Sequence, residues 1–140
     1  MDTNTIYSKF ESEISVRPDD IDMNNHVHNS KYFDFVLAAR YDQMTRCYGM
    51  SMDEFIRRGY GWVVTACRMN FKRPMKLGDT AVVRTQISEV RTNGVNVLFE
   101  IVRKETQKLC VDGVFEYTMI NLSTQRAENI PDDVITKYTI

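Results

Sequence analysis

Four long segments in the second half of the chain alternate between apolar and polar residues. They span residues 62–71, 80–90, 95–105 and 109–122. Side chains that alternate with a period of two point to opposite faces of a strand, so Val95, Val97 and Phe99 fall on one face. The pair Asn93-Gly94 is a strong signal for a tight turn between antiparallel strands. The pattern therefore predicts four consecutive antiparallel strands with one buried face.

A long helix is predicted before these strands, over residues 31–48. Its apolar residues recur at spacings of three and four, and they are Phe33, Val36, Leu37, Tyr41, Met44 and Tyr48. Gly49 is a natural stop for this helix. Phe35, Ala38 and Ala39 extend the apolar character around the helix axis. We therefore expect a helix that is buried along most of its girth.

Two shorter elements complete the expected order. Residues 10–16 predict a strand that Pro18 ends, and residues 51–58 predict a helix with Ser51 and Glu54 in a capping box. Together the elements predict an α+β fold in which a five-stranded antiparallel sheet wraps a long central helix. Such a sheet leaves edges that a second copy can cover, so we expect a homodimer or a homotetramer.

The composition restricts the class of protein. The 140 residues contain no internal repeat or linker, so a single domain over residues 1–140 is expected. No apolar run approaches the roughly 20 residues of a membrane span, and residues 1–10 lack the apolar block of a signal peptide. We therefore expect a cytoplasmic protein without a membrane partner. The 18 basic and 19 acidic residues give a net charge of −1, which argues against nucleic acid as a partner.

The three cysteines, Cys47, Cys67 and Cys110, form no C-x-x-C motif. An odd and unpatterned set argues against a disulfide framework or a zinc site, so we expect reduced thiols. Cys67 lies between apolar neighbours in a predicted strand. A buried structural thiol is therefore a better interpretation of Cys67 than a nucleophile.

The densest cluster of functional side chains lies in the polar loop of residues 20–29, just before the long helix. Asp22 and His26 offer a carboxylate and an imidazole, which can attack, activate water or protonate a leaving group. Asn24 can orient water or a substrate. The helix amides at residues 29–31 lack intrahelical acceptors, so they can stabilise a carbonyl oxygen that becomes negative during acyl transfer.

The same loop has a simpler interpretation. Asp, Asn and Ser also gather before helices because they cap free amides and make turns, and the residues alone favour neither interpretation. His26 and His28 alternate as metal ligands can, but the sequence offers no recurring third or fourth ligand. A neutral, hydrogen-bonded histidine is commoner, so no metal and no organic cofactor is expected.

The stretch RPDDIDMNNHVHNSKYFDFVLAAR, residues 17–40, resembles the signature of the hydroxybenzoyl-CoA thioesterase and acyl-ACP thioesterase superfamily. That signature reads D-x-D-x-x-G-H-V-N-N-x-x-Y and precedes a central helix. The residues that match it in register are Asp20, Asp22, His26, Val27, Asn29 and Tyr32. The segments KRPMKLGD and NLSTQRAENIP also resemble turns of this family. The resemblance implies a hotdog fold and hydrolysis of a thioester.

Roles for individual residues follow from the resemblance. It implies that Asp22 acts as nucleophile or base, and the spacing Asp22-x-Asn24-x-His26 is similar to that of plant acyl-ACP thioesterases. The catalytic set is therefore expected to be Asp22, Asn24 and His26. The residues expected to bind the substrate are Asn29 and Ser30 at the helix start, Tyr32, and the basic residues Lys72 and Arg73, which could meet coenzyme A phosphates or an acidic carrier protein.

Several positions depart from the family pattern. Asn25 stands where many members have Gly, His28 where many have Asn, and Leu37 where many carry Glu. The acyl-ACP branch places acidic and cysteine residues near the start of its third strand, whereas this chain has the sequence KRPM at residues 72–75. The full mechanism of either branch therefore cannot be copied onto this chain.

Three functions compete at this point. The leading hypothesis is hydrolysis of an acyl-CoA or acyl-ACP thioester, as in fatty acid metabolism, with an apolar acyl pocket near Tyr32, Phe33 and Trp62. A non-catalytic hotdog protein that binds acyl thioesters is the second. A hotdog hydratase or dehydratase is the third. Asp22 in the signature position favours hydrolysis over both alternatives.

Overall fold

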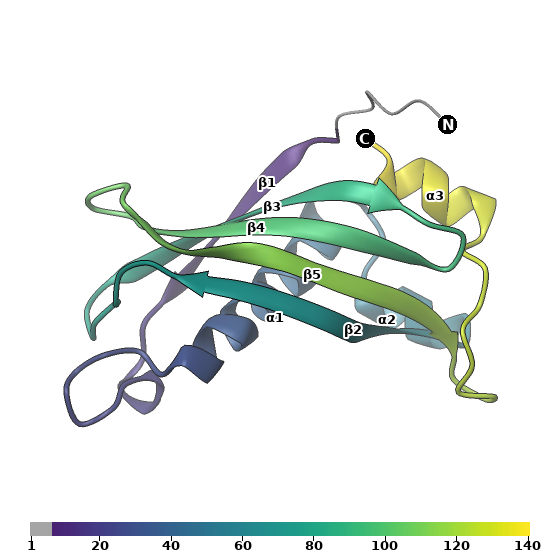
Figure 1. Ribbon diagram of the computed structural model, residues 1–140. Coiled ribbons are helices and arrows are strands. Elements are labelled where there is room, and N and C mark those ends of the chain that lie inside the picture. The colour runs from purple at the N-terminus through teal and green to yellow at the C-terminus, as the bar shows by residue number, and fades with distance from the viewer. Residues whose placement is uncertain (1–6) are drawn as a thin grey trace.

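Five antiparallel strands form one curved sheet, and a long helix packs across its inner face (Figure 1). The computed structural model describes residues 7–140. The strands are β1 (Lys9–Ser15), β2 (Tyr60–Phe71), β3 (Thr80–Val90), β4 (Gly94–Arg103) and β5 (Leu109–Asn121), in the spatial order β1-β3-β4-β5-β2. The helices are α1 (Asn29–Arg46), α2 (Met52–Arg57) and α3 (Asp132–Tyr138), and a short 3₁₀ turn, η1, spans Pro18–Asp20. The predicted α+β architecture is confirmed.

The alternation in the strands decides which face of the sheet is buried. In the central strand β4, Val97 lies opposite Ile87 of β3 and Phe115 of β5, and all three side chains are buried. Leu98, the next residue along β4, is exposed on the outer face. One face of each strand is therefore apolar enough to form the core, as the period of two predicts.

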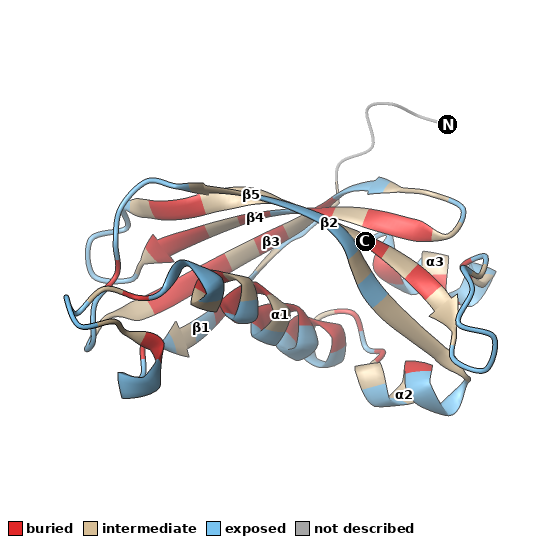
Figure 2. Cartoon of the chain, turned by 60° about the horizontal axis from the view of Figure 1, so that its bottom comes forward, coloured by how far each residue is buried: buried red, intermediate tan, exposed pale blue. Residues whose placement is uncertain are grey.

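Helix α1 covers the inner face of the sheet with one side only. Figure 2 shows buried residues on the side of α1 that faces the sheet and exposed residues on the opposite side. Val36 and Ala39 are fully buried, whereas Asp34, Ala38 and Tyr41 are exposed. The prediction of burial along most of the girth is therefore wrong, because the curved sheet does not close around the outer side of the helix.

A buried polar network fixes α1 against β1 and β3. The Gln43 amide donates to Ser12 Oγ at 3.1 Å, and the Thr85 hydroxyl donates to Gln43 Oε1. The Ser12 hydroxyl in turn donates to Asp42 Oδ2 at 2.6 Å. Because buried polar groups are costly unless they are paired, these bonds restrict how α1 can slide or rotate on the sheet.

Helix α2 confirms Ser51 as the predicted N-cap, since its hydroxyl accepts a hydrogen bond from the Glu54 amide at 3.3 Å. The reciprocal bond of a capping box, from the Ser51 amide to the Glu54 side chain, is absent among the described residues. Helix α3 was not among the predicted elements. Val134 and Tyr138 of α3 are buried, and the Tyr138 hydroxyl donates to the Met50 carbonyl at 2.8 Å. The apolar spacing after Pro131 indicates a helix in retrospect, although the segment is too short for periodicity to be decisive.

Strand β2 forms one edge of the sheet and exposes part of its length. Cys67 of β2 is exposed, so the prediction of a buried structural thiol at this position is wrong. The reason is that an edge strand has a neighbouring strand on one side only, so the middle of β2 is open to solvent. Cys110, on the neighbouring strand β5, is buried.

Within residues 7–140, no helix combines the length and the apolar character that a membrane crossing requires.

The substitution Phe115→Ala should lower the free energy of unfolding by about 3–5 kcal/mol, because it removes a large buried ring. The Phe115 side chain is fully buried, and its ring centroid lies 4.9 Å from that of Phe33 and 5.4 Å from that of Phe99. Urea denaturation measures the change. Ile56→Ala, at an exposed position of α2, is the control and should change stability by less than about 0.5 kcal/mol. Equal effects of the two substitutions would contradict this description of the core.

Candidate active site

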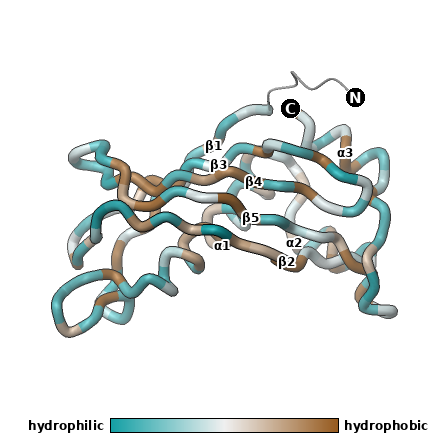
Figure 3. Tube along the Cα trace, in the orientation of Figure 1, coloured by the Kyte–Doolittle hydropathy of each residue, from teal (hydrophilic) through white to brown (hydrophobic). Residues whose placement is uncertain are grey.

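The polar loop before α1 lies at one end of the molecule, where Figure 3 shows a largely hydrophilic stretch of chain. Ile21 and Val27 form an isolated antiparallel bridge that closes the loop. The buried carboxylate of Asp20 accepts a hydrogen bond from the Arg17 amide at 2.8 Å, and the Asp20 carbonyl accepts one from the His28 amide at 2.9 Å. Asp20, a signature residue, therefore has a structural role in shaping the loop.

Asp22 lies inside this closed loop with its carboxylate fixed by backbone amides. Its Oδ1 atom accepts hydrogen bonds from the amides of Asn24 at 2.8 Å and His26 at 3.1 Å. The His26 amide first and the Asn24 amide second lower the pKa of Asp22, and partial desolvation opposes them. The carboxylate is therefore ionised at neutral pH. Its second oxygen, Oδ2, has no hydrogen-bond donor within residues 7–140.

Asn25 connects the loop to the turn that follows β2. Its backbone has a φ of 60°, in the left-handed region that Gly and Asn tolerate best. This conformation explains why Asn can stand where related proteins often have Gly. The Asn25 side-chain oxygen accepts a hydrogen bond from the Leu77 amide at 3.1 Å, and the Val27 amide donates to the Met75 carbonyl at 2.9 Å. The loop therefore docks against the turn of residues 72–79.

Tyr32 attaches α1 to the same turn. Its side chain is only 2% exposed, and its hydroxyl accepts a hydrogen bond from the Met75 amide at 3.0 Å. Burial raises the pKa of Tyr32, so the phenol stays neutral. The Tyr32 ring also lies 6.0 Å from the Phe71 ring, centroid to centroid. These contacts position the start of α1 beside the end of β2.

The first turn of α1 presents free backbone amides. His28 occupies the N-cap position, but its side chain makes no capping hydrogen bond. The Lys31 amide donates to the His28 carbonyl at 2.9 Å, whereas the amides of Asn29 and Ser30 have no acceptor in the part of the chain that the structure describes. At the positive end of an 18-residue helix, these two amides are suited to hold a negative oxygen.

A cavity of about 520 Å³ brings most of the predicted site residues together. Its lining consists of Asp22, His26, Val27, His28, Asn29, Tyr32, Phe71, Lys72, Arg73 and Pro74. Phe71 and Pro74 were not predicted to belong to the site. Their contribution depends on the docking of the β2 turn against the loop, which the local sequence does not reveal.

Two predicted residues lie outside this lining. Asn24 faces an adjacent hollow that it shares with Asp22, and its contribution to the carboxylate is the backbone amide. Ser30 is exposed and offers its amide. His26 contacts Asp22 through its backbone, and its imidazole forms no hydrogen bond with any residue from 7 to 140. The catalytic and binding roles of all these residues stay predictions.

Lys72 and Arg73 are both exposed at the rim of the cavity. Their amides donate to the Cys110 carbonyl at 2.7 Å and 3.1 Å, which fixes the turn. The Arg73 guanidinium donates to the Leu109 carbonyl at 2.9 Å, and the Lys72 ammonium has no carboxylate partner among the described residues. The rim therefore offers two positive charges to an anionic ligand.

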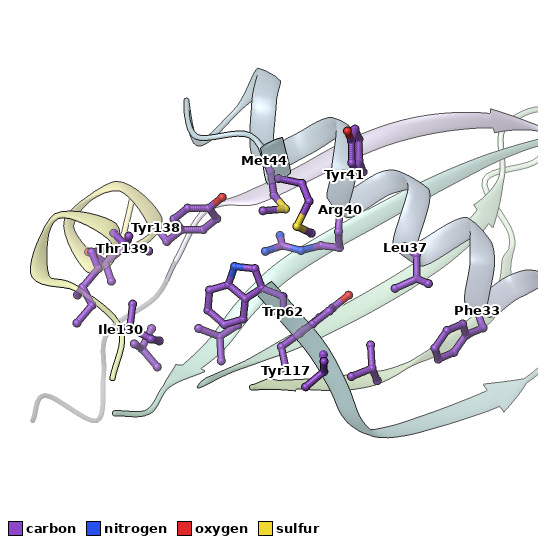
Figure 4. Close-up of a pocket in the computed structure, with 17 residues that line it drawn as sticks. Phe33, Leu37, Arg40, Tyr41, Met44, Trp62, Tyr117, Ile130, Tyr138 and Thr139 are labelled. Atoms are coloured by element: carbon purple, nitrogen blue, oxygen red, sulfur yellow. The ribbon is translucent and has the colours of Figure 1, made fainter. Parts of the chain in front are cut away.

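A second cavity, of about 490 Å³, lies between α1, β2 and α3 and is mostly apolar (Figure 4). Phe33 and Trp62 line it, as the predicted acyl pocket requires, whereas Tyr32 lines the first cavity instead. Asn29, Phe33 and Leu37 follow one another along one face of α1, since they are four residues apart. One face of α1 therefore borders both cavities.

One charged residue of this second cavity was not predicted from the residue pattern. Arg40 is buried and lines it between Leu37 and Met44. A usable signal was present in the sequence, because Arg40 interrupts an otherwise apolar stripe of the helix. Within residues 7–140, no cluster of three or more His, Cys, Asp or Glu side chains is arranged to hold a metal ion.

Comparisons with known proteins point to one superfamily. The model of the thioesterase-like superfamily matches residues 16–137. The long-chain acyl-CoA thioesterase FadM of Escherichia coli (strain K12) is 26% identical over 119 residues, which cover 84% of this chain and 87% of FadM. The chloroplastic acyl-[acyl-carrier-protein] hydrolase FATB3 of Cuphea viscosissima is 31% identical over 81 residues, which cover 58% of this chain and 20% of that protein.

The fold also has a close counterpart among solved structures. A DHNA-CoA thioesterase from Staphylococcus aureus superimposes with a TM-score of 0.87 at 19% identity, over 94% of this chain and 89% of that chain. This likeness confirms the predicted hotdog arrangement of a five-stranded sheet around one long helix. Since the superfamily model matches residues 16–137, from the end of β1 into α3, the chain belongs to the thioesterase-like superfamily.

Proposed function

We propose that this protein hydrolyses acyl thioesters and that Asp22 is the acting group. One observation carries the proposal: the amide-fixed carboxylate of Asp22 lines the same cavity as Asn29, at the start of α1 where two amides are free. A carbonyl oxygen held by the amides of Asn29 and Ser30 would place its carbon within the cavity that Asp22 lines. Acyl transfer needs a reactive group and donors to the carbonyl oxygen at one site, and this cavity offers both.

We propose nucleophilic attack by Asp22 rather than general-base catalysis, because its Oδ2 atom has no hydrogen-bond donor among the described residues. A carboxylate with a low pKa is a weak base toward water, but it is fully ionised at neutral pH. Attack of its free Oδ2 on the thioester carbonyl carbon would form a mixed anhydride and expel the thiolate, which takes a proton from solvent. Water would then hydrolyse the anhydride to the acid and restore Asp22. The His26 imidazole lines the cavity and would orient that water.

We propose acyl-CoA as the first carrier to test. The basic rim of Lys72 and Arg73 suits the phosphates of coenzyme A, and the relative FadM, named as a long-chain acyl-CoA thioesterase, aligns with most of this chain. An acidic carrier protein would use the same rim. The acyl group would extend from Asn29 along Phe33 and Leu37 into the apolar cavity.

The hydratase hypothesis has less support from this site. A hydratase needs a group that takes a proton from the acyl chain or from water, so the pKa of that group should lie near neutrality. The pKa of Asp22 is shifted in the opposite direction. A protein that binds acyl thioesters without hydrolysis would use the same cavities, and only a rate measurement separates it from a thioesterase.

We also propose that two copies pair through their β2 strands in the cytoplasm. Strand β1, the other edge, carries the exposed charges Lys9, Glu11 and Glu13, which discourage edge-to-edge pairing. The middle of β2 exposes Thr65, Ala66 and Cys67 and carries no acidic residue. This edge of 12 residues carries Arg68 as its single charged residue and is therefore better suited than β1 to accept a second copy of itself.

The substitution Asp22→Asn should lower the rate of thiol release by at least about a hundredfold, because the amide cannot attack a carbonyl carbon as the carboxylate does. Release of coenzyme A from a panel of short, medium and long acyl-CoAs measures this rate, with acyl-ACPs as a second panel. Asp34→Asn removes a similar charge from an exposed position of α1 and should leave the rate unchanged. Retention of the full rate in Asp22→Asn would exclude Asp22 from the mechanism.

The pH dependence of kcat/KM should reflect the fixed carboxylate. Because its amide donors stabilise the ionised form, the pKa of Asp22 lies below its ordinary value, and Asp22 loses its charge only when the pH falls below that lowered value. The rate should therefore stay level down to about pH 4, the ordinary range of an Asp carboxyl. Circular dichroism at each pH checks that the protein stays folded. A decline near neutral pH would contradict Asp22 as the group whose ionisation sets the rate.

The substitution Cys67→Lys should shift the protein from dimer to monomer. Self-pairing about a two-fold axis brings the middle of one β2 strand close to the same segment of its copy, so added lysines would repel each other. Light scattering after size-exclusion chromatography gives the mass of each species. Thr106→Lys, in the exposed turn between β4 and β5, adds the same charge elsewhere and should leave the mass unchanged. A monomeric wild type would refute the pairing.

A further inference from the structure

Arg40 carries a buried positive charge that no carboxylate neutralises. Its side chain is 7% exposed, and its Nη1 atom donates to the Tyr48 hydroxyl at 3.4 Å and to Thr85 Oγ1 at 3.3 Å. The guanidinium also lies over the Tyr48 ring, 5.2 Å from its centroid. These partners are neutral, and no Asp or Glu forms an ion pair with Arg40 within residues 7–140. A buried cation without a counterion is expensive to maintain.

Two further donors at the same cavity lack partners. The Tyr117 hydroxyl and the Trp62 indole nitrogen are buried, and neither forms a hydrogen bond with a described residue. Burial raises the pKa of Tyr117 to about 12, so its hydroxyl keeps its proton and can donate. Native proteins leave few such groups unpaired, so each one calls for a physical explanation.

The three donors come from different elements and lie around one space. In Figure 4, Arg40 extends from α1 above Trp62 of β2, and the Tyr117 hydroxyl is directed from β5 towards α1. All three residues line the apolar cavity, and no Asp or Glu is among its lining residues. Three side-chain donors therefore lie at this otherwise apolar cavity, and its lining provides no carboxylate to accept from them.

The position of these donors relative to the thioester site is set by α1. Arg40 lies about three turns, or roughly 16 Å along the helix axis, from Asn29 at the helix start. Phe33 and Leu37 occupy the turns between them and also line the cavity. An extended acyl group held at Asn29 would therefore reach the donors with its far end, after passing an apolar stretch.

We propose that this cavity selects acyl groups that bear an acceptor oxygen near the far end, a carboxylate above all. The inference rests on the proposed thioesterase function and adds a substrate class to it. A terminal carboxylate would neutralise Arg40 and accept hydrogen bonds from Trp62 and Tyr117. A chain that ends in a methyl group would leave the donors unpaired, which a site built for hydrogen bonding penalises.

Trp62 makes the proposal testable without any hydrolysis. It is the only tryptophan of the chain and it lines the cavity, so its fluorescence reports occupancy directly. The probes are thioethers of coenzyme A, which cannot be hydrolysed as thioesters, with dodecyl chains that end in a methyl, a hydroxyl or a carboxyl group. We expect the carboxyl-ended probe to bind wild type at least about tenfold more tightly than the methyl-ended probe.

The variant Arg40→Met should abolish this preference while the methyl-ended probe still binds, because methionine keeps the cavity apolar and removes the charge. Thermal unfolding checks that the variant is folded. Tyr117→Phe removes a single hydroxyl and serves as a second test that perturbs folding little; it should reduce the preference several-fold. Tyr41→Phe is the matched control, since the Tyr41 side chain also lines the cavity but is half exposed, and it should leave the preference unchanged.

The outcomes separate this inference from the proposed hydrolysis. Three results would overturn the selection of oxygen-bearing acyl groups. Wild type could bind the three probes equally, none of the probes could change the Trp62 fluorescence, or both folded variants could keep the preference. Thiol release that depends on Asp22 would still establish a thioesterase in that case. Conversely, a preference that Arg40→Met abolishes would support the inference even if no thioester is hydrolysed.

Discussion

The packing of α1 against the inner face of the sheet is the contact on which the rest of the structure depends. A single sheet cannot bury its own apolar face, so Val97, Ile101 and Phe115 need a covering element. Val36 and Ala39 of α1 supply that cover and are fully buried. The polar bonds around Gln43 then fix the helix in one position, because a shift would leave buried groups unpaired. The side chains and the N-terminal amides of α1 are therefore held in fixed positions relative to the strands.

The two cavities follow from the placement of this one helix. Its N-terminus brings the free amides of Asn29 and Ser30 beside the fixed carboxylate of Asp22, where the end of β2 and its turn complete the cavity. Its apolar stripe, from Phe33 towards Arg40, forms one wall of the second cavity. One helix therefore borders both the polar cavity and the apolar cavity, which suits the proposed substrate with its polar carrier and its apolar acyl group.

Much of this arrangement could be predicted, and the exceptions have a common cause. The strands and α1 follow from local periodicity, α2 follows from its capping signal, and six of the eight predicted site residues line one cavity. The exposure of Cys67, the exposed side of α1 around Ala38, and the position of Arg40 in an apolar cavity were missed. Each of them depends on which neighbouring element covers a given face, and periodicity within one segment carries no information about that cover.

The sequence by itself determined the local features of the protein: the alternation that makes the strands, the spacing that makes α1, and the loop signature in which Asp22 precedes a helix start. These features depend on contacts between residues close in the chain. Only the tertiary structure decided that Lys72 and Arg73 reach the Asp22 loop, and that Trp62 and Tyr117 lie around Arg40. Those groups come from separate strands, so their meeting depends on sheet order, curvature and helix docking, which are settled only when the whole core packs.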